Sequence, residues 1–474
     1  MSKCVFVTVC LCLAVLAGCG SGGTSDPTNL GSNGSGSGSG GATTLTVAPS
    51  NTRVLVGGTQ QFTASEDVVW AVNSVAGGND IVGTISSAGL YQAPNIVPFN
   101  PVITIKATSE ATGSVGSVQA NLGGLTGNRF AYVASASDNS IQTFTADAGT
   151  GKLQQTSTFT LAAGTAPTAL AVSPNGAFLM SLNRGSNDIS IYAIDAATGN
   201  LSSAGAVSVP SRPYAMVFSS TGDFAYVSCD GASTVAAFAF SVASGALTPL
   251  SDGSYVATSG KIQSLTISPD GKFLYTVNRD ANQIIGLAIA ADGSLSSIAG
   301  SPFAAQPGLS SIALNTGNYS GDYQFLYASS ENGIEAYDRD VRSGALTYLP
   351  SATQTDAGNS PKLFRNVSDG VLVAVNPQSG GAFSHVFDYL ALPPGALSPG
   401  GAPVSTGTSP VAGGWLWSDS GGTNWVYVLN RQADPTSATG SIGVYHVDHT
   451  HGLGGPAATI STDSHDPTGF VVTP

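Results

Sequence analysis

The greater part of the chain repeats one pattern about every 49 residues, and this periodicity constrains the fold more than any other feature. A tight turn, marked by glycine with leucine two residues later, recurs at Gly151, Gly199, Gly245, Gly293, Gly344 and Gly395, with a variant at Gly452. The segments between these turns alternate apolar and polar residues and are long enough for about four short strands each. Seven such copies predict a β-propeller, which is a closed ring of four-stranded sheets.

Two further landmarks recur in step with these turns. Segments 275–278 and 427–430 read Tyr-x-x-Asn, and looser copies of this predicted strand end at Ser135, Asn183, Cys229, Ser330 and Asn376. The runs Ser-Pro-Asn-Gly at 173–176 and Ser-Pro-Asp-Gly at 268–271 predict type I turns, because proline suits the second position and glycine the fourth.

The two ends of the repeat region are expected to pair with each other. Residues 467–472 resemble the innermost strand predicted at 167–172, whereas no such strand precedes Phe130. The C-terminus should therefore supply the inner strand of the first blade, which would leave no open sheet edge.

The segment 267–278 reads Ile-Ser-Pro-Asp-Gly-Lys-Phe-Leu-Tyr-Thr-Val-Asn and resembles the repeats of the YVTN and lactonase-type seven-bladed propellers. That family includes the 6-phosphogluconolactonases and the muconate-lactonising enzymes. The resemblance extends over all seven copies, so residues 128–474 are expected to form the propeller. Because the motif is architectural, it implies the fold more directly than the activity.

The first residues predict an export signal. Lys3 precedes the apolar run 4–16, which is too short to span a bilayer as a mature helix. The run ends in Leu-Ala-Gly-Cys at 16–19, which resembles the lipobox of bacterial lipoproteins. That resemblance implies cleavage before Cys19 and attachment of a lipid to its thiol. An ordinary secretory signal with a chance cysteine is the alternative.

A lipid anchor at Cys19 would make the membrane one partner of this protein. Residues 1–18 would then be the signal peptide, and residues 19–42, rich in Gly and Ser, would form a flexible tether. The residue after the cysteine is Gly20 and not an aspartate. Among lipoproteins this implies an outer-membrane or cell-surface location in the bacterial envelope.

Residues 43–122 show strand periodicity in short runs. Their length and their single Trp70 fit a small β-sandwich. The runs 56–64, 69–72 and 83–94 resemble bacterial Ig-like domains of group 2, which implies a spacer or adhesion module with Trp70 in its core. The expected fold class is therefore all-β, with an N-terminal Ig-like β-sandwich followed by a seven-bladed β-propeller.

Composition excludes some functions. Charged residues make up 9 % of the chain, against about 25 % in typical domains, and the net charge is −13. A nucleic-acid partner is not expected, because phosphate contacts require clustered Lys and Arg. The body beyond Cys19 holds one thiol, Cys229, which is expected to be structural because no histidine lies near it in sequence. We expect a monomer. We also expect no cofactor, because no haem or quinone motif is present.

Propeller geometry places six basic residues on one face of the ring, near its central funnel. Three of them follow an asparagine at the end of a predicted second strand. The six are Arg184, Arg212, Lys261, Arg279, Lys362 and Arg431. Such a ring could bind a carboxylate or phosphate ester. Equally, the asparagines could cap turns while the cations are solvated or paired with acidic residues of the same face, namely Asp188, Asp230, Asp280, Glu331, Asp434 or Asp466.

The resemblance to lactonases also implies a Pro-Arg-His run entering an inner strand and Asn-Glu after the next strand. The corresponding positions here are Tyr214-Ala215, Gln263-Ser264 and Ser310-Ser311, and none of them supplies the histidine. The glutamate of the Asn-Glu pattern is present as Glu331. If the protein is an enzyme, Glu331, Arg279 and His465 are the candidate catalytic residues, because lactone opening needs a base and a group that stabilises the oxyanion.

Histidines also gather at His446, His449 and His451, but they are predicted on the outer rim of the opposite face, so no metal site is expected there. Two functions remain. The first is a lipid-anchored binding protein whose partner is a protein, a glycan or a small anionic ligand. The alternative is a lactonase-like hydrolase, related to 6-phosphogluconolactonase, that acts on a lactone or a small anionic ester.

Overall fold

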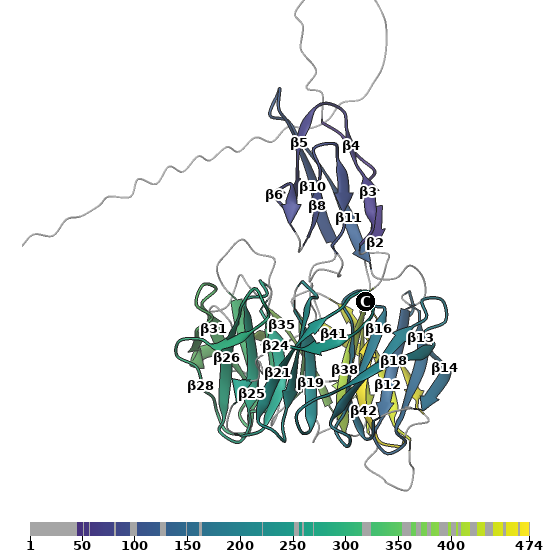
Figure 1. Cartoon of the computed structure of the whole chain (residues 1–474), viewed down its shortest axis with the longest axis vertical. Coiled ribbons are helices and arrows are strands. Elements are labelled where there is room, and N and C mark those ends of the chain that lie inside the picture. Colours follow the sequence, from purple (N-terminus) through teal and green to yellow (C-terminus); the bar gives the residue numbers. More distant parts are fainter. Residues whose placement is uncertain are drawn as a thin grey trace, which may run out of the picture. The chain divides into compact units, whose positions relative to one another are not determined.

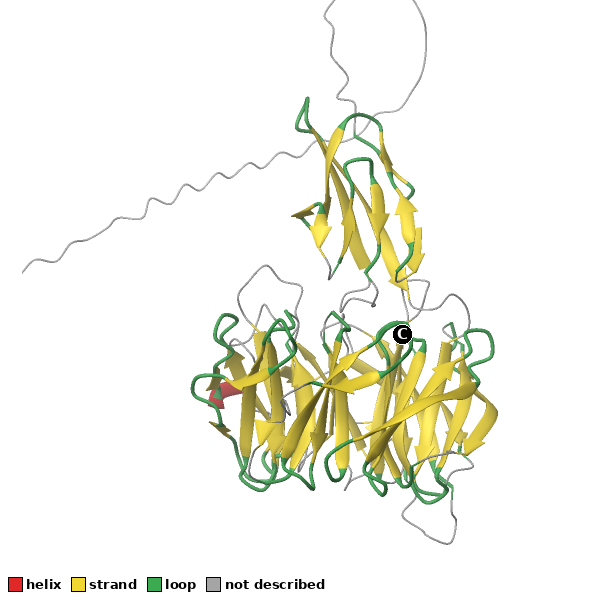
Figure 2. Ribbon diagram, in the orientation of Figure 1, coloured by secondary structure: helices red, strands yellow, loops and turns green. Residues whose placement is uncertain are grey.

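The computed structural model describes residues 45–473, with gaps at 51, 56, 80–81, 95–101, 124–128, 148, 161–163, 220, 251–255, 258–259, 269, 315–323, 353–361, 366–370, 377–380, 388–396, 400–403, 406–408, 418–423, 432–438, 449–451 and 463–464. It is almost entirely strand (Figure 2), with one short 3-10 helix, η1 (Pro350–Ala352), in the described part of the chain. The all-β class predicted from the sequence is confirmed.

The N-terminal region forms two main sheets around one core (Figure 1). The first has the order β2 (Thr52–Leu55), β11 (Val115–Gly123), β10 (Val102–Ser109), β5 (Val68–Val72) and β6 (Val75–Ala76); the second has the order β3 (Thr59–Gln61), β9 (Leu90–Gln92), β8 (Gly83–Ile85) and β7 (Gly78–Asn79). A two-stranded pair joins β1 (Val47–Ala48) to β4 (Thr63–Ala64). Trp70 is 5 % exposed and belongs to this core with Phe62 and Tyr91, as expected of a core tryptophan.

The remaining strands form seven sheets, which we call blades 1 to 7 in chain order. In each blade the strand nearest the centre is called the inner strand. Blade 1 pairs β42 (Pro467–Val472), β12 (Arg129–Ser135), β13 (Ser140–Ala146) and β14 (Leu153–Thr160). Blade 2 pairs β15 (Pro167–Val172), β16 (Phe178–Asn183), β17 (Asp188–Ile194) and β18 (Leu201–Ser208). Blade 3 pairs β19 (Pro213–Phe218), β20 (Phe224–Cys229), β21 (Thr234–Phe240) and β22 (Leu247–Pro249), with β23 (Val256–Ala257) beside β21.

The other four blades continue the same order. Blade 4 pairs β24 (Ile262–Ile267), β25 (Phe273–Asn278), β26 (Gln283–Ile289) and β27 (Leu295–Ser297), with β28 (Phe303–Ala304). Blade 5 pairs β29 (Ser311–Leu314), β30 (Gln324–Ser330), β31 (Gly333–Arg339) and β32 (Leu346–Tyr348). Blade 6 pairs β33 (Lys362–Arg365), β34 (Val371–Asn376), β35 (Gly381–Phe387) and β36 (Leu397–Pro399), with β37 (Val404–Ser405). Blade 7 pairs β38 (Pro410–Trp417), β39 (Asn424–Asn430), β40 (Ser441–Asp448) and β41 (Gly452–Ser461).

The ring is closed in the way that the sequence predicts. The C-terminal strand β42 pairs antiparallel with β12, and Val472 lies opposite Ala131. Beyond the strand, the backbone N–H of Thr473 donates to the carbonyl of Phe130 at 2.8 Å. Each inner strand contacts the inner strands on both sides, from β42 through β15, β19, β24, β29 and β33 to β38 and back to β42.

A hydrogen bond that recurs between neighbouring blades accounts for the recurring glycine turns of this chain. Tyr132 lies in blade 1 and donates its hydroxyl to the carbonyl of Gly199 in blade 2 at 2.9 Å. The same bond joins blade 3 to blade 4, blade 4 to blade 5 and blade 7 to blade 1. Gly199 also has a φ of +73°, and a Cβ atom there would collide with the Phe130 ring of the neighbouring blade. The turn must therefore carry glycine, because only glycine combines this backbone with so close an approach.

The Ser-Pro-Asn-Gly turn is also confirmed, because the N–H of Gly176 donates to the carbonyl of Ser173 at 2.8 Å. Cys229 is completely buried on β20, and burial raises the pKa of its thiol to about 12. At neutral pH this thiol is protonated and packs as an apolar side chain, as predicted.

Candidate functional site

The seven inner strands surround a cavity of about 620 Å³. Each blade contributes to its wall, so the cavity lies at the centre of the propeller. The lining residues are Thr168, Ala169, Leu170, Arg184, Tyr214, Ala215, Gln263, Ser264, Arg279, Ser310, Ser311, Leu363, Val411, Ala412, Gly413, Arg431, Thr468, Gly469 and Phe470.

The position of these residues in the blades follows one rule. In blades 1, 2, 3 and 7 the inner strand begins with a proline, and the residues directly after that proline line the cavity. In blades 4 and 5 the corresponding residues are Gln263-Ser264 and Ser310-Ser311. These positions are the ones at which the resemblance to lactonases predicts catalytic side chains. The cavity lining therefore includes the positions at which the resemblance implies catalytic side chains, although no histidine occupies them.

The wall is polar on one side. Blade 3 supplies Tyr214, blade 4 supplies Gln263 and Ser264, and blade 5 supplies Ser310 and Ser311. Gln263 is 6 % exposed, and its side-chain amide forms no hydrogen bond within the described part of the chain. The Ser264 hydroxyl accepts a bond from the Ile312 backbone at 3.3 Å, which leaves its proton available to a ligand.

On the other side the wall is mainly apolar, although Arg184 of blade 2 and Arg431 of blade 7 also line it at the rim. Blade 6 supplies Leu363, blade 7 supplies Val411, blade 1 supplies Phe470 and blade 2 supplies Leu170. Two threonines on this side direct their hydroxyl protons away from the cavity. Thr468 donates to the carbonyl of Pro167 at 2.6 Å, and Thr168 lies 3.3 Å from the carbonyls of Leu182 and Pro213.

Three arginines line the cavity from equivalent positions. Arg184, Arg279 and Arg431 each follow the asparagine that ends the second strand of blades 2, 4 and 7. The antiparallel register places each of these strand ends beside the start of the inner strand, as Asn183 lies opposite Pro167. We call this end of the blades the rim. The sequence-based placement of these cations at the mouth of the funnel is thus supported by the cavity lining.

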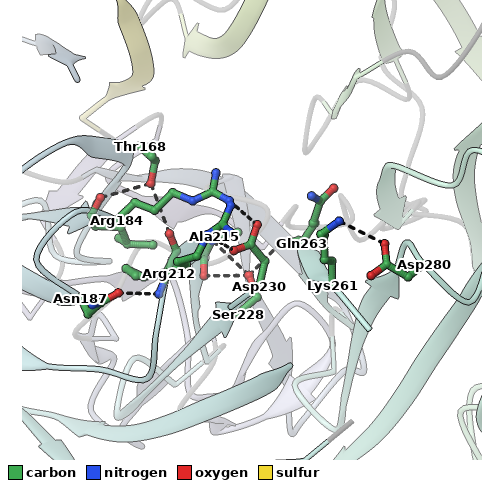
Figure 3. A network of polar contacts seen from close by, with 12 residues as sticks. Thr168, Arg184, Asn187, Arg212, Ala215, Ser228, Asp230, Lys261, Gln263 and Asp280 are labelled. Atoms are coloured by element: carbon green, nitrogen blue, oxygen red, sulfur yellow. Dashed lines mark hydrogen bonds and ion pairs between the residues drawn. The ribbon is translucent and has the colours of Figure 1, made fainter. Parts of the chain in front are cut away.

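Two of these arginines are held by carboxylates. Arg184 of blade 2 donates to Asp230 of blade 3 at 2.6 Å, and Asp230 also lies 3.2 Å from the Nε of Arg212 (Figure 3). The pair joins two blades, and the Asp230 side chain is 1 % exposed whereas that of Arg184 is 29 % exposed. Arg431 of blade 7 pairs with Asp466, which precedes the inner strand of blade 1, at 2.7 Å.

Arg279 differs from the other two arginines. Its backbone N–H donates to the carbonyl of Lys261 at 3.0 Å, but its guanidinium makes no ion pair with any residue that the structure describes. The nearby Lys261 instead pairs with Asp280 at 3.5 Å (Figure 3). Arg279 is therefore a cation at the cavity whose guanidinium is not paired with a carboxylate of the described residues, so it can donate to a ligand.

The rim backbone is braced between blades. The N–H of Arg212 donates to the side-chain oxygen of Asn187 in the preceding blade at 2.7 Å, and the N–H of Ala166 donates likewise to Asn139. Arg212 and Ala166 have φ of +61° and +49°, although each precedes a proline. Non-glycine residues rarely adopt this conformation, so the bonds from asparagine hold a strained rim in place.

The other candidate residues lie elsewhere. Glu331 follows β30 of blade 5 at the position equivalent to Arg279, is exposed, and is not among the described lining residues. His465 is also outside the lining; its Nδ1 lies 3.5 Å from Asp138, and its backbone N–H donates to the same carboxylate. Partial burial raises the pKa of Asp138, but hydrogen bonds from Ser135 and His465, together with the charge of His465, lower it overall.

Some candidate residues named from the sequence lie outside the part of the chain that the structure describes. Lys362 begins β33, but its side chain is outside the described residues, as are Cys19, Asp434, His449 and His451. His446 packs its ring against Trp425, with 5.6 Å between ring centroids. No cluster of three metal-ligating side chains occurs among the residues that the structure describes. Nor does that part of the chain contain a helix long and apolar enough to cross a membrane.

Comparisons with known proteins agree with this architecture. The sequence model of the family described as lactonase, 7-bladed β-propeller, matches residues 118–264 and 213–361, which together span just over half of the chain. No curated protein matches the chain significantly.

Solved structures show the same fold. The periplasmic gluconolactonase of Pseudomonas aeruginosa superposes with a TM-score of 0.59 at 18 % identity, covering 73 % of this chain and 99 % of its own. A Bacteroides uniformis protein provisionally described as a 6-phosphogluconolactonase gives a TM-score of 0.57 at 18 % identity, with the same 73 % and 99 % coverage. A protein of Lactobacillus plantarum gives 0.58 at 18 % identity over 73 % and 99 %. At these identities the likeness establishes the fold alone.

Proposed function

The chain belongs to the lactonase family of seven-bladed β-propellers, and on that premise we propose that it hydrolyses a lactone, or a related small anionic ester, bound in the central cavity. One observation carries the proposal. Arg279, which has no ion-pair partner in the described part of the chain, lines the same cavity and belongs to the same blade as Gln263 and Ser264. The side chains of these residues supply donors suited to a carbonyl oxygen that becomes negative during the reaction.

The chemistry follows from these donors. Water attacks the lactone carbonyl carbon, the new C–O bond forms, and the negative charge on the carbonyl oxygen is stabilised by Arg279 and Gln263. We propose that Glu331, at the rim of the next blade, takes the proton of the attacking water. When the ring C–O bond breaks, the same proton passes to the departing ring oxygen, which yields the open hydroxy acid.

A turnover screen tests this function. The purified full-length chain is given a panel of γ- and δ-lactones, and ring opening is followed by acid release at constant pH. We expect hydrolysis, and we expect Glu331→Gln to lower kcat about 100-fold, because a lost general base costs roughly 10²- to 10⁴-fold and this base is exposed. Glu110→Gln, an exposed glutamate of the N-terminal region, is the matched control. Equal rates in both variants would remove Glu331 from the mechanism.

Binding without turnover is the second candidate function. The charged side chains that line the cavity are all arginines among the described residues, and arginine does not accept protons at neutral pH. A protein of this kind would hold an anionic ligand between the paired and unpaired arginines of the rim. Calorimetry that detects binding of an open hydroxy acid, together with no hydrolysis of any lactone in the panel, would favour this second function.

We further propose that Cys19 carries a lipid that anchors the protein in the bacterial envelope, at the outer membrane or the cell surface. The support is the Leu-Ala-Gly-Cys run at 16–19 and the Gly- and Ser-rich residues that follow it. Cys19→Ala should abolish incorporation of labelled palmitate and move the protein from the membrane fraction to the soluble fraction, because the acyl chains supply the membrane affinity. Cys229→Ala, which changes a buried cysteine, is the control. An unchanged membrane fraction for Cys19→Ala would refute the anchor.

A further inference from the structure

The two sides of the cavity wall offer a ligand different chemistry, and from this difference we propose a substrate class. We infer that the cavity takes an amphiphilic lactone, in which one edge carries the ring oxygens and the opposite edge carries an alkyl or aryl substituent. The oxygens face blades 3 to 5, and the substituent packs on blades 6, 7, 1 and 2. This inference rests on the proposed function for the lactone ring and adds the nature of its substituent.

The polar side can recognise the lactone ring. Gln263, Ser264 and Arg279 come from one blade and each has a donor that no described residue uses. Ser311 of the next blade accepts a bond from the Leu363 backbone at 3.3 Å, so its own proton also remains available. Gln263 is buried, and its amide favours a ligand that brings an acceptor oxygen to it, because an unpaired buried polar group is costly.

On the apolar side the charged donors among the described residues are Arg184 and Arg431, and both are already paired with carboxylates. The threonines of this side, Thr168 and Thr468, direct their protons to backbone carbonyls, and Leu170, Val411 and Phe470 carry no polar side-chain atoms. A polyhydroxylated lactone would have to turn several hydroxyls toward this side, where each would lose its water partners without replacement. A hydrocarbon substituent instead gains by leaving water.

The apolar side is also well ordered. Phe470 is 6 % exposed, and its ring packs on Tyr427 with 5.7 Å between centroids. A Cβ at Gly469 would come within 3.1 Å of the backbone of blade 2, so the inner strands of blades 1 and 2 approach closely here. The surface that receives the substituent is therefore held in place before the ligand arrives, which reduces the entropy lost on binding.

The test compares two δ-lactones, one with a pentyl side chain and one that is polyhydroxylated (δ-gluconolactone). Hydrolysis rates are measured with the lactones, and dissociation constants are measured by calorimetry with the two corresponding δ-lactams, which resist hydrolysis. We expect the pentyl lactam to bind at least about 10-fold more tightly, in line with the effect of one or two buried methylenes.

Two variants test which side of the cavity causes the tighter binding of the pentyl lactam. Val411→Thr keeps the shape of the side chain but places a hydroxyl on the apolar side, and it should reduce the binding ratio to about 3-fold or less, because the pentyl chain then meets a polar group. Ser264→Ala should weaken both lactams alike and leave their ratio unchanged, because both present the same ring to the polar side.

The outcomes separate this inference from the proposed function. If the pentyl lactam binds more tightly but no lactone is hydrolysed, the amphiphilic cavity stands and the hydrolase assignment fails. If δ-gluconolactam binds as tightly as the pentyl lactam, the amphiphilic cavity is refuted, whether or not lactones are hydrolysed. A ratio that Val411→Thr leaves unchanged would also refute it, because the preference would then arise elsewhere.

Discussion

Replacing Arg279 with glutamine is expected to lower kcat/KM for lactone hydrolysis by about 100- to 1000-fold, which is the usual cost of removing one donor to a developing oxyanion. Arg279 lines the cavity and makes no ion pair with a described residue, so its removal leaves no described carboxylate without a partner. The loss should therefore appear in catalysis rather than in stability. Initial rates and a thermal melt of the same preparation measure the two effects separately.

Arg342→Gln is the matched control, because it removes the same charge from blade 5. Arg342 is exposed and follows β31, at the end of the blade opposite the rim. Arg184 would be a poor control, because its removal would leave the buried carboxylate of Asp230 with only Arg212 beside it. If Arg279→Gln and Arg342→Gln retain the same kcat/KM, Arg279 does not stabilise the transition state.

Gly199→Ala is expected to lower the free energy of unfolding of the propeller by about 2–5 kcal/mol. A φ of +73° costs an alanine roughly 1–2 kcal/mol, and the added Cβ would collide with the Phe130 ring, where overpacking costs roughly 1–3 kcal/mol. The bond from Tyr132 to the Gly199 carbonyl would also be displaced. Urea unfolding followed by intrinsic fluorescence measures the loss.

Gly205→Ala separates the collision from the backbone effect. Gly205 lies in the same blade with a φ of +137°, and a Cβ there would meet no atom within 4 Å. Its replacement should cost only the backbone strain, about 1–3 kcal/mol. Equal losses in the two variants would mean that contact with Phe130 contributes nothing to the choice of glycine at position 199.

The propeller and its closure could be predicted from the sequence, because the same turn motifs recur in each blade. Gly199 could be recognised as a turn residue from its spacing alone. Its contact with Phe130 and Tyr132 could not, because that contact joins different blades. The C-terminal strand could be assigned to blade 1 because residues 467–472 repeat a pattern that is missing before Phe130.

The sequence places six basic residues at one end of the propeller but does not show which of them line the cavity, and the catalytic candidates Glu331 and His465 are not among the described lining residues. The sequence places Arg184, Arg279 and Arg431 at one rim, and all three line the cavity. The sequence does not show that Arg184 is paired with Asp230 while Arg279 has no described partner, because ion pairing depends on side-chain directions across blades. Gln263 and Ser264 are not predicted as ligand-binding residues from the sequence, because the family resemblance implies a histidine at such positions and neither residue matches it.

The pairing of β42 with β12 has a consequence for how the protein is made. During synthesis, strand β12 is the first strand of the propeller to emerge, but the strand that covers its inner edge is the last strand of the propeller to emerge. Every shorter product lacks the strand that joins blade 7 to blade 1, so its ring stays open with an unpaired edge. The inner edge of β12 is therefore covered only in a chain synthesised through Val472. A shorter chain keeps an exposed strand edge, which chaperones and proteases can recognise.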